Sequence, residues 1–170
     1  HSYNVAGTYN AILVVANSGG CADTATLTVV VNPKPSADFI VAAVCEGVVS
    51  SFADASTGNI INYGWSFGDG NISAQQNPSN TYASANTYNV TFIVQSDSSC
   101  YDTITKQAVV NPVPVVDFTT GAVCLNQSNT FSNTTTIASG SVSNWAWDFG
   151  DAQISSQQSP SHIYSAQGTY

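Results

Sequence analysis

Apolar and polar residues alternate along several short stretches of the chain, with the period of two that is typical of half-buried β-strands. The clearest example is Tyr9–Val15, in which every second residue is apolar from Tyr9 onward. We expect one face of this strand to be fully buried and the other to be partly covered. Asn17–Gly20 has the composition of a hairpin turn, and Thr24–Val31 then returns as a β-branched strand.

Seven more short strands are predicted between Pro33 and Pro112, separated by clusters of turn residues. They span Ala37–Val41, Val48–Ala53, Ile61–Phe67, Ile72–Ala74, Asn80–Tyr82, Tyr88–Gln95 and Asp102–Val110. No stretch has a 3.6-residue apolar period of useful length, so we expect essentially no helix. Seven strands at this spacing predict an all-β fold, an antiparallel sandwich of two sheets.

Nearly the same sequence occurs three times along the chain. Residues Gly64–Tyr88 return at Asn144–Tyr170, and their last third returns at His1–Tyr9. Tyr3, Tyr82 and Tyr164 hold the same place in the three copies, at spacings of 79 and 82 residues. A repeat this regular indicates tandem structural units, and does not by itself indicate a chemical activity.

The repeat divides the chain into three units. Residues 1–32 supply the last two strands of one domain, residues 33–112 form a complete domain, and residues 113–170 form a domain that lacks its last two strands. Two prolines stand at each boundary, and linkers this short and proline-rich are stiff. Two alternatives explain the incomplete ends: the segment is a window into a longer array, or the two strands of one copy complete the third unit of the next by strand addition.

Few charges are present, and nearly all of them are negative. Charged residues make up 7% of the chain, and two lysines stand against ten acidic residues, for a net charge of −8. Two cations cannot neutralise a nucleic-acid backbone or an anionic membrane surface, so both classes of partner are excluded. Membrane insertion by a helix is not expected either, because no apolar run of about 18 residues occurs.

The sequence does not support catalysis, and we expect no enzyme, no catalytic residues and no cofactor-binding residues. The two histidines, His1 and His162, stand at equivalent places in a repeated motif, which favours a structural role. The complete domain has no histidine, the chain has no arginine, and Glu46 is its one glutamate. Paired carboxylates at a workable separation are not apparent.

Aromatic residues recur on one face of the predicted strands, and we interpret them as core. Burying each ring stabilises the fold by about 2–3 kcal/mol. The predicted core residues are Trp65, Phe67, Tyr82, Tyr88, Phe92, Trp147, Phe149 and Tyr164. The alternative, a platform for stacking on sugars, requires an exposed Trp ring at Trp65, Trp147 or Trp145. It favours Trp145 slightly, since no tryptophan matches it in the second unit, where Tyr63 stands.

A glycine-rich segment follows the aromatic strand in both units and is interpreted as a tight turn, because glycine takes positive φ and Asp accepts hydrogen bonds from backbone N–H groups. The turn residues are Gly68, Asp69, Gly70, Gly150 and Asp151. Calcium is the alternative, since carboxylate and amide oxygens suit a hard cation. The carboxylates are spread singly, however, and we expect no cofactor and no metal site.

The repeated sequence motifs together resemble the signature of PKD (polycystic kidney disease) domains. The resemblance rests on Trp65–Gly70, Gln76-Asn77-Pro78, Tyr82 and Thr87–Val90, with matching motifs in the other two units. It covers essentially the whole chain, with two departures: Asn86 replaces a glycine, and Ala152 replaces Gly70. The resemblance implies tandem immunoglobulin-like β-sandwiches that act as spacers or interaction modules.

Two further motifs resemble those of PKD repeats in Bacteroidetes surface adhesins and gliding-motility proteins. They are the Val-Cys motif at Cys45 and the Cys-x-Asp-Thr motif at Cys21 and Cys100. In such proteins Asp-Thr before a small or aliphatic residue resembles an O-glycosylation acceptor, which implies Thr24 and Thr103 as candidates. The other reading of both is a polar start to a strand.

The four cysteines occupy two repeated frames and suit an oxidising, extracellular setting, so we expect a structural disulfide. The candidates are Cys21, Cys45, Cys100 and Cys124. In an immunoglobulin-like topology Cys45 and Cys100 lie near opposite ends of the domain, about 20 Å apart, which exceeds the reach of a disulfide. A pair within the domain and a pair between successive domains both stay open.

Together these features predict a structural or adhesive repeat segment of an extracellular filament or giant surface adhesin. It would act as a rigid spacer and as a protein- or glycan-interaction module. Its partners would be neighbouring repeats, copies of itself placed end to end, or surface glycans and proteins. The alternative is a set of accessory binding repeats of a secreted enzyme that degrades polysaccharide or protein.

Overall fold

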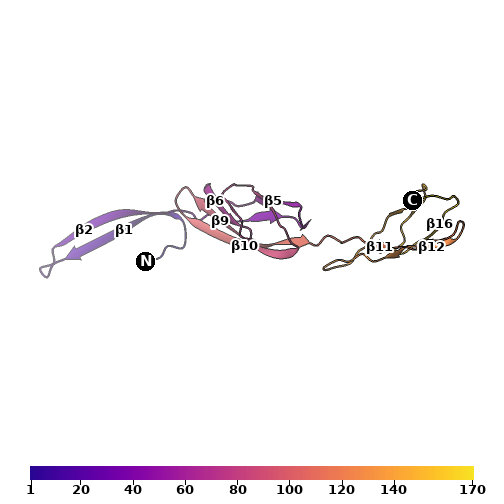
Figure 1. Ribbon diagram of the computed structural model, residues 1–170. Helices are drawn as coiled ribbons and strands as arrows, with labels where there is room; N and C mark the ends of the chain where they lie inside the picture. The colour runs from indigo at the N-terminus through magenta and orange to yellow at the C-terminus, as the bar shows by residue number, and fades with distance from the viewer. The chain divides into compact units, whose positions relative to one another are not determined.

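The computed structural model describes residues 1–170, and the chain is all-β, as predicted. It divides into two compact units. Figure 1 follows the chain from residue 1 to residue 170 and labels its strands. The first unit comprises residues 1–44, 48–82 and 87–109, and the second comprises residues 45–47, 83–86 and 110–170. No helix that could span a membrane is present.

The N-terminal hairpin pairs β1 (Gly7–Ala16) with β2 (Ala22–Val31) in antiparallel register, from Gly7 opposite Val31 to Ala16 opposite Ala22. In its turn the Asn17 side-chain oxygen accepts hydrogen bonds from the N–H groups of Gly19 and Cys21. The prediction of a fully buried face was wrong. Both faces are exposed, because no second sheet packs against the hairpin; Ile12 and Leu13, on opposite faces, are 64% and 63% exposed.

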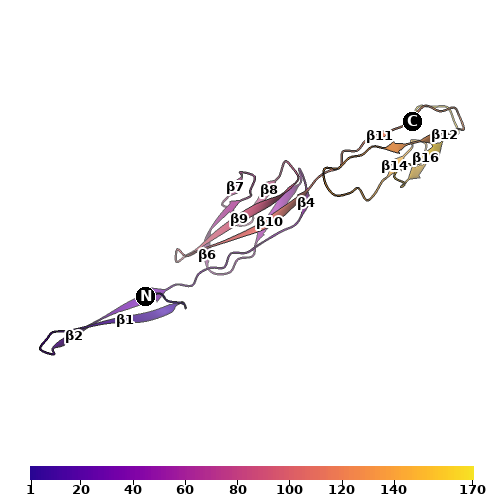
Figure 2. The same cartoon turned by 90° about the horizontal axis from the view of Figure 1, so that it is seen from below.

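The complete repeat is a sandwich of two antiparallel sheets, shown from another side in Figure 2. The five-stranded sheet has the order β4 (Val44–Cys45), β10 (Tyr101–Asn111), β9 (Asn86–Ser96), β6 (Ile60–Ser66) and β7 (Ile72–Ser73). The three-stranded sheet has the order β3 (Phe39–Val41), β5 (Val49–Asp54) and β8 (Ser79–Thr81). All seven predicted strands are confirmed, and the sequence analysis missed only β4, whose two residues are too few to show a period.

The core of this repeat lies between the two sheets, where alternate residues of each strand meet. Within β9, the apolar residues Val90, Phe92 and Val94 are completely buried, whereas Ile93 points outward and is 42% exposed. The strand therefore shows the two-residue alternation that the sequence predicted. On the facing sheet, Phe39 and Phe52 are also buried.

The third repeat has the same chain path but less sheet. Its strands form three two-stranded pairs: β11 (Phe118–Thr119) with β13 (Ser132–Asn133), β12 (Ser128–Thr130) with β16 (Ser161–Ile163), and β14 (Trp147–Asp148) with β15 (Ile154–Ser155). β14 is two residues long, whereas its counterpart β6 is seven. The residues equivalent to β9 beyond Tyr88, and to β10, are not among these 170.

Candidate functional site

Trp65 lies at the centre of the complete repeat. Its indole ring stacks on Phe92 with centroids 3.7 Å apart, and its Nε1 donates a hydrogen bond to the Gln75 carbonyl at 2.8 Å. Phe39 packs edge-on against it at 5.2 Å. With 3% of its surface exposed, Trp65 has no ring face free for a sugar.

Phe67 and Tyr82 continue this cluster toward the turn. The Tyr82 hydroxyl donates a hydrogen bond to the Phe67 carbonyl at 3.0 Å, so both buried polar groups are satisfied at the end of the strand that carries Trp65 and Phe67. Tyr88 is half-buried and stacks on Tyr82 at 4.1 Å. Phe52 contacts Phe67 at 5.0 Å. Phe39 and Phe52 were missing from the predicted core, because a single aromatic residue in a short strand does not reveal its partner.

The predicted core residues of the third repeat make the same hydrogen bonds as their counterparts in the second repeat, but their side chains are less buried. Trp147 donates from Nε1 to the Gln157 carbonyl at 2.8 Å, and the Tyr164 hydroxyl donates to the Phe149 carbonyl at 3.1 Å. Phe149 is buried, but Trp147 and Tyr164 are only half-buried. Trp145 is also half-buried, and its buried Nε1 has no hydrogen-bond partner.

The turn after the aromatic strand is built as predicted from glycine and aspartate. Gly68 and Gly70 have φ of 82° and 97°. Asp69 Oδ2 accepts hydrogen bonds from the side-chain amides of Asn80 at 2.7 Å and Asn71 at 3.0 Å. Burial raises the pKa of the Asp69 carboxyl, but these hydrogen bonds outweigh burial and hold that pKa below its usual value.

In the third repeat a histidine takes the place of Asn80. His162 Nε2 lies 2.8 Å from Asp151 Oδ2, and the imidazole stacks on Phe149 with centroids 4.3 Å apart. Burial raises the pKa of Asp151, but the hydrogen bonds with His162 and from the Gln153 N–H outweigh it and lower that pKa. Ala152, which replaces a glycine, is held at φ 67°. The aspartate therefore anchors the turn in both repeats through a different partner.

The carboxylates do not gather into a metal-binding cluster. No group of three or more His, Cys, Asp or Glu side chains is placed to hold a metal ion. Both oxygens of Asp69 already accept N–H groups from Asn71, and one also accepts from Asn80, which leaves the carboxylate turned toward donors rather than toward a cation site.

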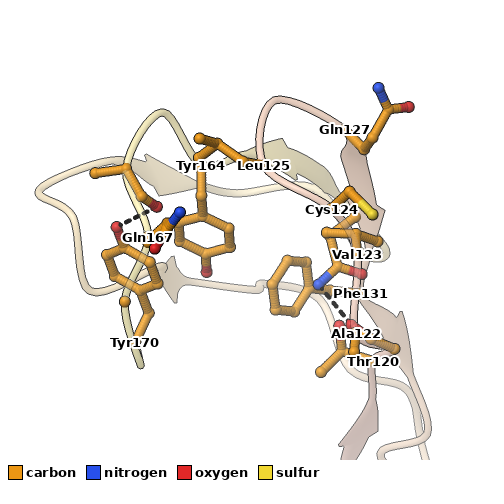
Figure 3. Close-up of a pocket in the computed structure, with 14 residues that line it drawn as sticks. Thr120, Ala122, Val123, Cys124, Leu125, Gln127, Phe131, Tyr164, Gln167 and Tyr170 are labelled. Atoms are coloured by element: carbon orange, nitrogen blue, oxygen red, sulfur yellow. Dashed lines mark hydrogen bonds between the residues drawn. The ribbon is translucent and has the colours of Figure 1, made fainter.

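The third repeat carries two hollows. One, of about 430 Å³, lies between the Cys124 loop and the C-terminal segment, with Phe131, Tyr164 and Tyr170 facing it (Figure 3). The other, of about 380 Å³, is lined by Phe118, Trp145 and other residues of the segment that leads into β14.

Comparison with known proteins places this geometry in a family. The PKD domain family matches residues 32–111 and 109–170. The chain belongs to the PKD domain family. Among solved structures, the PKD1 domain of Vibrio anguillarum Epp is 30% identical with a TM-score of 0.43, over 46% of this chain and 95% of that one.

Two other solved structures are similar. The PKD1 domain from the Vibrio cholerae metalloprotease PrtV is 32% identical with a TM-score of 0.42, over 46% of this chain and 98% of that one. A carbohydrate-binding module of the β-sandwich superfamily is 17% identical with a TM-score of 0.46, over 59% of this chain and 55% of that one. PKD domains occur in secreted and extracellular proteins, and the membership supports a structural or binding repeat module.

All four cysteines of these PKD repeats are free thiols, so the expected disulfide is not formed within the chain. The pair of Cys45 with Cys100 is ruled out by length. Cys45 lies beside the end of β10, since the Glu46 N–H donates to the Asn111 carbonyl, and Cys100 immediately precedes the start of β10. The length of β10 puts the two about 33 Å apart, whereas a disulfide needs Cα atoms within about 7 Å.

Both candidate acceptors for O-glycosylation are exposed at the start of the second strand of a hairpin. The N–H of Thr24 donates a hydrogen bond to the Asp23 carboxylate at 2.8 Å. Asp102, before Thr103, is instead engaged by the linker. Exposure is compatible with modification and equally with the polar strand start that the sequence offered as the alternative.

Two carboxylates hold the linkers of the complete PKD repeat, and the sequence analysis missed both roles. The Asp102 carboxylate accepts hydrogen bonds from the Lys34 ammonium at 2.6 Å and from the Ala37 N–H at 2.8 Å. The bond with Lys34 lowers the pKa of Asp102. Glu46 accepts the N–H groups of Ala85 at 2.9 Å and Val113 at 3.3 Å. Nothing local in the sequence reports contacts between residues this far apart.

Proposed function

We propose that this chain is a non-catalytic spacer and adhesive segment of an extracellular filament or giant surface adhesin, of the kind found on Bacteroidetes. Its role is to hold interaction surfaces at a fixed distance from the cell surface. The observation that carries the proposal is the bonding of both proline-rich linkers to carboxylates of the complete repeat.

At the first linker, Asp102 binds the side chain of Lys34 and the backbone of Ala37 on either side of Pro35. Proline fixes one backbone angle of the linker, and these hydrogen bonds restrain the residues around it. An exposed ion pair alone adds little to stability. The backbone hydrogen bond to a charged acceptor is the stronger of the two restraints.

At the second linker, the half-buried carboxylate of Glu46 joins the Ala85 loop to Val113, between Pro112 and Pro114. The Glu46 N–H also donates to Asn111. One residue therefore restrains both the end of β10 and the linker that follows it. In the third repeat Leu125 holds the equivalent place, so this restraint belongs to the junction after the complete repeat.

The alternative is a set of binding repeats that accompany a secreted polysaccharide- or protein-degrading enzyme. A row of exposed aromatic rings on one sheet would favour it. The five-stranded sheet instead has a hollow of about 480 Å³ at its β6–β7 side, where the aliphatic residues Ile72 and Ile93 lie beside Tyr63 and the nearly buried Trp65. This surface favours a spacer with protein contacts over a sugar platform.

Distances between spin labels test the spacer role. Labels are placed at Thr103→Cys and Ser156→Cys, in a chain whose four native cysteines are changed to serine. We expect a narrow distribution of distances between the second and third repeats. Glu46→Ala should broaden it, because it removes the acceptor for Val113.

Asp23→Ala is the matched control, because it deletes an exposed carboxylate of the hairpin that accepts a hydrogen bond from the N–H of the next residue. The control should leave the distribution unchanged. A broad distribution in the parent chain would contradict the spacer proposal, and equal broadening by both variants would show that Glu46 is not what restrains the linker.

A further inference from the structure

The turn after the aromatic strand contains Asp69-Gly70, the one Asp-Gly sequence of the chain, and no Asn-Gly sequence occurs. An aspartate followed by glycine is chemically labile in a flexible chain. Glycine has no side chain to shield its backbone nitrogen, and its conformational freedom lets that nitrogen approach the carboxyl group of the aspartate. Both residues are exposed, so water reaches them. The covalent stability of this turn therefore depends on how the carboxyl group is held.

The reaction at such a pair is an isomerisation of the backbone. The Gly70 nitrogen attacks the side-chain carboxyl carbon of Asp69 and closes a succinimide ring, while the carboxyl hydroxyl and the amide proton leave as water. Addition of water then opens the ring. Opening at the side-chain carbonyl restores aspartate, whereas opening at the backbone carbonyl gives isoaspartate, in which the chain runs through the former side chain. The water lost is regained, so the mass is unchanged and no oxidant or cofactor is needed.

The folded turn restrains the carboxyl group of Asp69. Its Oδ1 accepts the Asn71 N–H at 3.0 Å, and its Oδ2 accepts the side-chain amides of Asn80 at 2.7 Å and Asn71 at 3.0 Å. Rotation of the carboxyl carbon toward the Gly70 nitrogen would break these hydrogen bonds. Burial raises the pKa of Asp69, but the bonds from Asn80 and Asn71 outweigh burial and lower that pKa, so the protonated form, from which water leaves, is scarce. Both effects slow the first step.

The third repeat builds the same turn with different side chains. His162 stands where the second repeat has Asn80, and Gln153 stands where it has Asn71. Asp151 Oδ2 contacts His162 Nε2 at 2.8 Å, and Asp151 Oδ1 accepts the backbone N–H of Gln153 at 3.1 Å. The backbone hydrogen bond of the turn is kept, and an imidazole replaces the buried amide of Asn80.

The third repeat also lacks the glycine of the labile pair. Ala152 follows Asp151 and has a φ of 67°, a backbone conformation that disfavours any residue with a Cβ. Space is not the reason for glycine in the second repeat, because a Cβ at Gly70 would meet no atom within 4 Å. Glycine therefore follows the aspartate where two asparagine side chains hold its carboxylate, and alanine follows it, in spite of the strain, where they do not.

We propose that Asp69-Gly70 is a site of spontaneous isoaspartate formation, which the side-chain amides of Asn71 and Asn80 suppress while the turn is folded. A repeat whose turn opens loses this protection. Isoaspartate adds a carbon atom to the backbone and moves the carboxylate onto the main chain, so the hydrogen bonds from Asn80 cannot form again. An opening that lasts long enough for the reaction therefore changes the repeat permanently. This inference does not depend on the spacer role.

The first test compares the unfolded and the folded chain. Both are incubated at neutral pH, the unfolded one in urea, and are then digested with a protease that cleaves before aspartate but not before isoaspartate. Mass spectrometry of the fragments follows each site. In urea we expect cleavage before Asp69 to be lost first, and in the folded chain its loss should be at least about tenfold slower, because the hydrogen bonds to the carboxylate have to break. The site before Asp151 should stay cleavable and is the internal reference.

The second test uses variants of the folded chain. Asn80→Ala should speed the loss of cleavage before Asp69 by about tenfold, since it removes one hydrogen bond to the carboxylate. Asn71→Ala, at an exposed residue that the fold does not need, should speed it in the same direction. Gly70→Ala should stop it in either background. Val94→Ala is the control: it destabilises the same repeat at a buried residue of β9 away from the turn, and should leave the rate unchanged.

Three outcomes overturn the proposal. The first is an unfolded chain that isomerises faster at another aspartate than at Asp69. The second is a folded chain in which neither Asn80→Ala nor Asn71→Ala speeds the reaction. The third is equal acceleration by these variants and by Val94→Ala, which would show that the fold as a whole, and not the two amides, protects the turn.

Discussion

The second and third repeats carry the same aromatic residues in the same order, yet only the second has a closed core. Trp65 is 3% exposed and Phe39 is 1% exposed, whereas Trp147 is half-buried and Phe118 is 48% exposed. The hydrogen bonds from the two tryptophan side chains are the same, each to a carbonyl ten residues ahead at 2.8 Å. The first strands of the fold therefore place the aromatic rings, and the last two strands bury them.

The largest difference should appear on truncating the residue that closes the core. Phe92→Ala is expected to lower the free energy of unfolding of the second repeat by about 3–5 kcal/mol, because Phe92 is completely buried against Trp65. Urea unfolding followed by Trp65 fluorescence, with Trp145 and Trp147 changed to phenylalanine, measures it. Leu13→Ala, the equivalent change in the exposed hairpin, should leave this transition within about 0.5 kcal/mol. Equal losses would contradict the comparison.

The turn glycines should differ next. A Cβ at Gly68 would lie 2.7 Å from the Asn89 carbonyl oxygen, at φ 82°, so Gly68→Ala should cost at least about 2 kcal/mol in the second repeat. At Gly150 the nearest atom is 3.4 Å away on Tyr170, and the positive φ alone should cost about 1 kcal/mol. Denaturant unfolding of each variant, followed by amide hydrogen exchange in the two turns, checks the order. A larger cost at Gly150 would contradict it.

The buried tyrosine hydroxyl should have a smaller effect. Tyr82→Phe leaves the ring in place and removes the hydrogen bond to the Phe67 carbonyl, at a cost of about 1 kcal/mol. Tyr164→Phe should cost less, because Tyr164 is half-buried and water can replace its hydroxyl at the Phe149 carbonyl. Both are measured by the midpoint of urea unfolding.

The smallest effect is one of pH. The pKa of Asp69 is lower in the folded repeat than in the unfolded chain, so its carboxylate stabilises the fold above about pH 4. This contribution is lost as the pH falls through the lowered folded value. Asp69→Asn should flatten the loss of stability as the pH falls below about 4, seen as a smaller shift of the unfolding midpoint. Asp97→Asn removes a carboxyl outside the turn network and is the control for the loss of one negative charge. An equal flattening by both variants would contradict the role of Asp69.

The strands of the complete repeat could be predicted from sequence because each has one buried face, which writes a period of two into residues such as Val90, Phe92 and Val94. The same alternation misled the analysis at the N-terminal hairpin. There Leu13 and Val15 record the burial that a completed domain would give them, and the hairpin alone leaves them in water.

The polar contacts could not be predicted, because they join residues far apart along the chain. Asn80 meets Asp69 across 11 positions, and Glu46 meets Val113 across 67. Lys106 lies above the Phe39 ring, 67 positions away, and donates to the Phe39 carbonyl at 2.7 Å. Such pairs depend on the register between strands, which no local pattern reports.

The two lysines have a consequence for proteolysis. A trypsin-like protease needs a lysine or arginine in an extended, accessible segment, and these 170 residues offer only Lys34 and Lys106. The bond after Lys34 precedes Pro35, which such enzymes do not accept. Lys106 is in the middle of β10 and is paired with Asp38. Cleavage there requires the strand to leave the sheet, so digestion should proceed no faster than the second repeat opens.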